Sequence, residues 1–134
     1  LKMAFGLQGA AAEFLRDRYA GELTEDESTA TIGTSVSQVV GSDPDRLGLL
    51  LINLSANTVF VGLENTVSTT NGIRLGANGG SVSFNVTDDG MIQTRNMFAI
   101  ASGVGSAVYV ITLSRFIADR QVNAATVAAE GGLV

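Results

Sequence analysis

The strongest pattern in the sequence is a pair of apolar runs between Arg46 and Leu63, separated by the polar triplet Ser55-Ala56-Asn57. A polar break of that length between two strand-like runs is typical of a β-hairpin. In the first run both alternating sets of residues are apolar: Leu47, Leu49 and Leu51 on one face, and Leu50, Ile52 and Leu54 on the other. A strand hides both faces only when it is covered on both sides. The pattern therefore predicts a hairpin at the centre of a β-sandwich.

The other strands are predicted from short segments in which apolar and polar residues alternate. This period of two begins at Ser28 and runs to Val40, and it returns in segments 73–75, 81–86, 97–101 and 107–116, with turn residues between them. Gly103 and Gly105 form a lone G-x-G between two such segments, which indicates a turn and not a phosphate loop. Several short strands without intervening helices predict an all-β, antiparallel β-sandwich or jelly roll over residues 30–116.

Residues 1–29 are predicted to form an N-terminal arm that contains a helix. The helical stripe consists of Leu7, Ala11, Phe14, Leu15 and Tyr19. Gly21 lies where a C-terminal cap is expected. A helix of about 12 residues is marginal alone in water, so it must dock on another surface. That surface is either the chain's own sandwich or a neighbouring subunit. We expect the arm residues Phe5, Leu7, Phe14, Leu15 and Tyr19 to contact the partner.

Two further segments flank the predicted sandwich. Glu22 to Glu27 holds four carboxylates, which favours a solvated acidic linker; a calcium loop is the alternative, although the spacing does not match an EF-hand. Residues 117–134 are rich in Ala and Val and are predicted to form a C-terminal tail. The tail is either a weak helix capped by Asn123 or an arm that orders on a partner.

Composition suggests a protein whose surface is covered by others. The 134 residues are enough for one domain with a core of its own. Hydrophobic residues make up 46% and charged residues only 16%, whereas roughly 25% charged is usual for soluble domains. A surface with so few charges exposes apolar or hydroxyl groups unless a partner covers them. We favour the partner.

The missing residue types argue against most chemistry. The chain has no His and no Cys, which removes the commonest general base and the usual zinc and nucleophile chemistry. No nucleotide-binding loop is present. Eight scattered basic residues and a net charge of −5 do not suit nucleic acid. No apolar run approaches the ~20 residues that span a membrane. We therefore expect no enzyme activity, no cofactor, and no nucleic-acid or membrane partner.

Two pairs of carboxylates are the remaining candidates for a site. Asp43 with Asp45, and Asp88 with Asp89, could bind calcium or serve as paired acids of a glycosidase. Both pairs lie in turn-like segments, where Asp is expected because its side chain bonds nearby backbone amides. We favour the turn and keep a weak calcium site as the alternative.

A resemblance adds to this picture. Asp45–Phe116 contains DRLGLLLINLSANTVFVGLENTV, then STTNGIRL, GANGGSVSFNV, MFAIASG and VYVITLSR. In this order the segments resemble small β-sandwich structural proteins of tailed bacteriophage virions, of the capsid decoration (cement) kind. The resemblance covers about half of the chain and neither tail.

The resemblance implies a non-enzymatic protein on the exterior of a virion capsid. Its expected partners are the major capsid protein and further copies of itself, in a homotrimer or another closed ring. The same small domain also occurs in head-fibre and tail accessory proteins, which is the first alternative. A carbohydrate-binding β-sandwich module is the second, although the chain has no Trp and few aromatic residues to stack on sugars.

Overall fold

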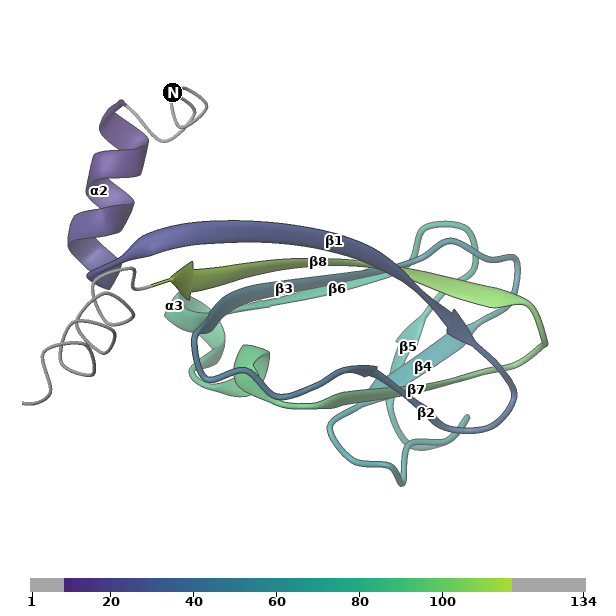
Figure 1. Ribbon diagram of the computed structural model, residues 1–134. Coiled ribbons are helices and arrows are strands. Elements are labelled where there is room, and N and C mark those ends of the chain that lie inside the picture. The colour runs from purple at the N-terminus through teal and green to yellow at the C-terminus, as the bar shows by residue number, and fades with distance from the viewer. Residues whose placement is uncertain (1–8, 117–134) are drawn as a thin grey trace, which may run out of the picture. The chain divides into compact units, whose positions relative to one another are not determined.

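The computed structural model describes residues 9–116, shown in colour in Figure 1. The described residues form one helix of more than one turn, two short helical turns and eight strands. The helices are α2 (Ala10–Tyr19), α3 (Val86–Asp89) and the 3₁₀ turn η1 (Ile92–Thr94). The strands are β1 (Glu22–Ile32), β2 (Ser37–Val40), β3 (Arg46–Asn53), β4 (Val59–Gly62), β5 (Ile73–Leu75), β6 (Ser81–Asn85), β7 (Met97–Ala101) and β8 (Ser106–Phe116).

The strands form two four-stranded sheets with the order of a jelly roll. One sheet has the order β1-β8-β3-β6 and the other β2-β7-β4-β5 (Figure 1). The assigned pairs between β2, β3, β4 and their neighbours are antiparallel. The prediction of an all-β sandwich with a jelly-roll arrangement is confirmed.

The core lies between the two sheets and consists of medium-sized aliphatic side chains. Strands from both sheets alternate buried and half-buried residues, as expected when one face of each strand points inward. The buried apolar cluster comprises Ile32, Leu49, Leu51, Val59, Val61, Leu75, Met97, Ala99, Ala101, Val108 and Val110.

The predicted central hairpin is wrong. β3 pairs with β6 and β8, whereas β4 pairs with β5 and β7 in the other sheet. The polar segment between them crosses from one sheet to the other, and Asn53 at its start is fully buried. The Asn53 side-chain amide donates to the carbonyls of Asn57 (2.7 Å), Leu75 (3.1 Å) and Gly76 (3.0 Å), and its oxygen accepts from Ser55. These bonds connect the crossover to the turn after β5.

The segment before β3 also differs from its prediction. Residues 28–40 contain the end of β1, a bend and then β2, which belongs to the other sheet. The acidic run from Glu22 to Glu27 is part of β1 and not a linker. Its low intrinsic strand propensity is overcome because β8, also 11 residues long, supplies a neighbouring backbone along β1.

The described chain divides into two compact units, which we treat separately. The larger spans Glu25–Ser114 and contains the core, and the smaller includes α2 with the adjoining ends of β1 and β8. The predicted arm and sandwich boundary at residue 30 therefore falls inside β1. The helix itself is confirmed, although Gly21 is not its left-handed cap: Ala20 has that conformation, with φ 57° and ψ 43°. The predicted tail, 117–134, lies outside the described residues.

Candidate functional site

Three of the predicted contact residues, Phe14, Leu15 and Tyr19, lie on α2. α2 has no buried residue, and the Phe14 side chain is 61% exposed. Leu15 and Tyr19 are half-buried. Phe5 and Leu7 lie outside the described residues. A ten-residue helix is marginal alone in water, so α2 depends on contacts with other surfaces.

Polar contacts hold the C-terminal end of α2. The Arg16 guanidinium pairs with the Glu22 carboxylate at 3.3 Å, at the start of β1. Arg18 lies over the ring of Tyr19, 5.6 Å from its centroid. Arg115 Nη1 donates to the Tyr19 carbonyl at 3.3 Å, which satisfies one of the last carbonyls of the helix. Cations at this end also suit the helix dipole.

The outer face of the β1-β8-β3-β6 sheet is apolar along its two inner strands, β3 and β8, while β6 contributes Ser81 and Ser83 opposite Ile52 and Leu50. Leu49 and Leu51 of β3 are buried, so the alternate residues Leu50 and Ile52 point away from the core. Across the ladder, Leu50 is opposite Ile111 and Ile52 is opposite Tyr109, while Leu113 pairs with Gly48. We call this set the outer stripe: Leu50, Ile52, Tyr109, Ile111 and Leu113, all half-buried.

The outer stripe corrects the prediction that the chain itself covers both faces of Leu47–Leu54. Only one face of β3 is covered within the described residues, and Leu54, just past the strand, is 54% exposed. Solvated faces of antiparallel sheets are usually polar. The apolar outer face therefore marks a surface that a partner can cover.

Beside the outer stripe, β1 contributes carboxylates. Its residues 24–29 are all exposed and include Glu25, Asp26 and Glu27. A side-chain hydrogen bond from Tyr109 to Glu27, with partial burial and the Glu27 charge adding to it, raises the pKa of Tyr109 above its usual value. The hydrogen bond between Glu27 and Tyr109 therefore connects acidic β1 to the outer stripe.

The two carboxylate pairs are engaged in local structure. Asp43 accepts from the Asp45 amide (3.0 Å) and from the Ser114 hydroxyl (3.3 Å). Asp89 accepts from the Asn85 amide at 2.8 Å, and Asn85 caps α3 by accepting from the Asp88 amide. These contacts agree with the turn interpretation. Residues 9–116 contain no group of three or more His, Cys, Asp or Glu that could hold a metal ion.

Arg46 is a buried cation with a structural role. It is 6% exposed, and its guanidinium donates to the carbonyls of Gln93 (3.1 Å) and Gly41 (2.8 Å). Burial lowers the pKa of Arg46, and the charge of Asp43 opposes that effect. Because its ordinary pKa lies far above neutrality, the group stays charged and ties the turn before β3 to η1. We assign it no binding function.

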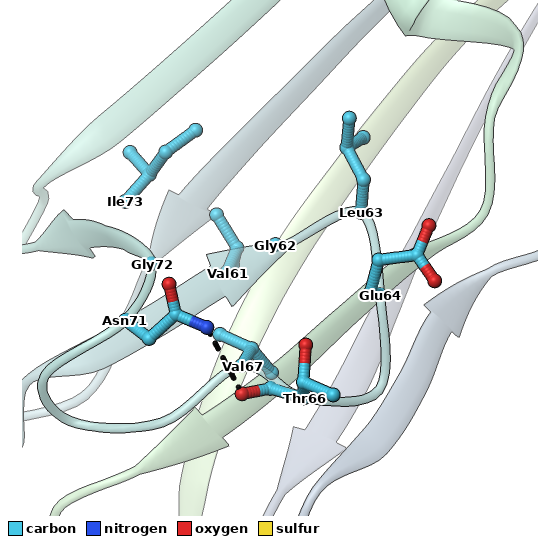
Figure 2. Close-up of a pocket in the computed structure, with 9 residues that line it drawn as sticks. All are labelled: Val61, Gly62, Leu63, Glu64, Thr66, Val67, Asn71, Gly72 and Ile73. Carbon is cyan, nitrogen blue, oxygen red and sulfur yellow. Dashed lines mark hydrogen bonds between the residues drawn. The ribbon is translucent and has the colours of Figure 1, made fainter.

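A hollow of about 280 Å³ opens at the end of β4, beside the loop to β5. Figure 2 shows the side chains of Val61, Leu63, Val67 and Ile73 around it, while the Asn71 amide bonds the Thr66 carbonyl at 3.2 Å. Glu64 points away from Asn71 and Ile73 and pairs with Arg95 at 3.0 Å.

The hollow suits one bulky apolar side chain and not acid–base chemistry. An apolar cavity of ~150 Å³ is enough for a benzene ring, so the space is adequate. The apolar Val67 inside a polar loop is the one sign of this hollow in the sequence. In the part of the chain that the structure describes, no helix is long and apolar enough to cross a membrane.

In comparisons with known proteins, the sequence matches no protein-family model and no curated protein. Among solved structures, the fold is similar to a chain from a study of Bacillus endospore appendages, described as a family of disulfide-linked pili. The two are 12% identical with a TM-score of 0.42, over 72% of this chain and 89% of that chain.

Proposed function

We propose that this chain is a non-enzymatic structural protein of an assembled particle. Its best-supported form is a capsid decoration protein that coats the exterior of a phage head. The outer stripe is the observation that supports this role most strongly: the outer faces of the two neighbouring strands β3 and β8 are apolar, where a solitary sandwich usually has polar residues. Such a face is stabilised when copies of the chain or a shell protein cover it.

The exposed side of α2 supports the same role. Phe14 is a large apolar group presented outside the sandwich core, and it is suited to contact the major capsid protein. Stable interfaces typically bury ~1,600 Å², and α2 and the outer stripe are two separate candidate contact surfaces. Repetition over a shell would add avidity to each contact.

The sugar-binding alternative has less support. Asp43 and Asp89 accept from backbone amides, and Asp88 accepts from the Asn85 side-chain amide. The hollow near β4 has mostly aliphatic walls without an aromatic platform. Tail or head-fibre location remains the rival within the structural class, because an apolar docking face would serve either place.

The test is co-sedimentation with undecorated capsids of tailed phages. Because β1 begins at Glu22, the arm is removed by deleting residues 1–20 and no more. We expect the full chain to bind and the deletion to bind at least tenfold more weakly, with Phe14→Asp reproducing most of the loss. Thr69→Asp, in an exposed loop, is the matched control. Undiminished binding of the deletion would rule out the arm as the attachment element. Electron microscopy of whole particles distinguishes head from tail.

A further inference from the structure

The outer edge of β1 has the features of an edge that another strand can join. In the described residues β1 has β8 on one side and no strand on the other. Its 11 residues contain no proline, and residues 24–29 are exposed on both faces. A free edge presents a row of unpaired N–H and C=O groups, which is a template for an added strand.

The N-terminal segment has the sequence of such a strand. Residues 1–8, LKMAFGLQ, alternate strictly: Leu1, Met3, Phe5 and Leu7 are apolar, and the residues between them are polar or small. That period is typical of a strand with one apolar face, and Leu7, which the helical period also includes, precedes the start of α2. α2 begins only at Ala10, and Gly9 before it has φ 102°, a conformation that permits a sharp change of direction there.

We propose that residues 1–8 of one copy add as a strand to the β1 edge of a second copy, along Glu25–Ile32. Both segments are eight residues long, about 26 Å when extended. This inference rests on the proposed structural role, since it names the surfaces that join two copies. Phe5 and Leu7 then contact a neighbouring subunit, as their place in the arm predicts.

The charges on β1 favour pairing with residues 1–8 over pairing with the β1 edge of another copy. β1 has four carboxylates (Glu22, Glu25, Asp26 and Glu27) and no basic residue. If the β1 strands of two copies paired edge to edge, the four carboxylates of each copy would lie close together. Like charges on neighbouring strands repel each other. Residues 1–8 contain Lys2 and no acid. The acidic run thus disfavours a symmetric edge dimer and admits the N-terminal segment.

A contact between two different surfaces of the same chain has a defined consequence. Such a heterologous contact closes into a ring when the rotation between copies allows it, and otherwise grows as a filament. β1 and the N-terminal segment therefore provide the head-to-tail link that a trimeric ring requires.

The test uses the chain without residues 1–8 and a synthetic peptide, LKMAFGLQ. The deletion leaves every described strand intact, and circular dichroism verifies the fold. We expect the peptide to bind and to slow amide hydrogen exchange over Glu25–Ile32. Lys2→Glu in the peptide should weaken binding about tenfold at low salt. A protein with Glu25→Lys, Asp26→Lys and Glu27→Lys should reverse that preference. A peptide with the same residues in the order LLKMFAGQ, which breaks the alternation, is the control.

Three results of the peptide and exchange experiments would overturn the proposal. They are failure of the peptide to bind, protection at residues other than β1, and protection of β1 in the full chain that does not depend on protein concentration. The last would show docking within one chain. If the full chain and the deletion form the same oligomer, strand addition is wrong while the structural role stands. If the full chain is monomeric and ignores capsids, the structural role fails independently of the peptide result.

Discussion

Leu50 of β3 lies directly opposite Ile111 of β8 on the face of the sheet that points away from the core. Both side chains are half-buried, and neither has a covering layer within the described residues. The next pair along the ladder, Ile52 and Tyr109, continues the same apolar surface. A cross-strand pair of this kind stabilises a sheet, but its outer surface gains more when a second protein excludes water from it.

Placing a charge in this pair should disrupt assembly without unfolding the sandwich. Leu50→Glu leaves Leu49 and Leu51 in the core, so we expect a folded protein with a dissociated oligomer. Size-exclusion chromatography with light scattering measures the result. Thr69→Glu adds the same charge in an exposed loop and should leave the oligomer intact. An unchanged oligomer in Leu50→Glu would show that the outer stripe is not an interface.

The buried Asn53 amide predicts a large loss of stability on truncation. Asn53→Ala removes its bonds to Asn57, Leu75 and Gly76 and takes this donor from the buried Leu75 carbonyl, while the Gly76 and Asn57 carbonyls keep bonds from Gly80 and Ser55. We expect a loss of about 3 kcal/mol or more in the free energy of unfolding, measured by urea denaturation. Asn96→Ala removes one exposed hydrogen bond, from Gln38, and should cost about 0.5 kcal/mol. Equal effects of the two changes would contradict the role given to Asn53.

Two glycines in one turn should respond differently to the same substitution. A Cβ on Gly80 would overlap the backbone N and O atoms of Gly76, whereas a Cβ on Gly76 would meet nothing within 4 Å. Gly80→Ala should therefore cost about 2 kcal/mol or more, and Gly76→Ala should be close to neutral. Thermal unfolding of both variants provides the measurement. A neutral Gly80→Ala would mean that the turn after β5 is looser than described.

Replacing Ala20 with glycine should stabilise the C-terminal end of α2. Its left-handed backbone, φ 57°, costs a residue with a Cβ about 1 kcal/mol relative to glycine. Ala20→Gly should slow amide exchange in α2, while Ala11→Gly inside the helix should speed it by a similar factor. Faster exchange in Ala20→Gly would argue against the left-handed cap.

The hydrogen bond between Tyr109 and Glu27 predicts a titration effect. It raises the pKa of Tyr109, so the folded state holds this phenol proton to higher pH than the unfolded chain does. Any stabilisation from the bond is present below the ordinary tyrosine pKa and is lost as pH rises through the folded value. Glu27→Gln should lower the Tyr109 pKa, as seen by absorbance of the phenolate, with Tyr109→Phe identifying the signal. An unchanged titration would contradict the contact.

The alternation of residues was sufficient to predict most strands but not how they connect. Segments such as 97–101 and 81–86 correspond closely to β7 and β6. The β3–β4 crossover was predicted as a hairpin because Asn53 bonds residues more than 20 positions away, which a local pattern does not contain. The acidic run was assigned to a linker for the same reason: its strand depends on pairing with β8.

The sequence indicated two of the candidate surfaces, the exposed side of α2 and the outer stripe, but not the hollow beside β4. Phe14 was identified because a helical period exposes a stripe regardless of what covers it. The outer stripe was identified as apolar, but a sequence pattern does not distinguish cover by the same chain from cover by another. The hollow beside β4 was missed because loop residues brought together only by folding form part of its wall.

The mass of the full chain in solution tests the central claim most directly. Sedimentation velocity over a hundredfold range of protein concentration measures it without labels or partners. We predict a discrete closed oligomer, with three copies as the expected number, that Leu50→Glu converts to monomer. A full chain that stays monomeric at every concentration would contradict the claim that its apolar outer face exists to be covered by further copies.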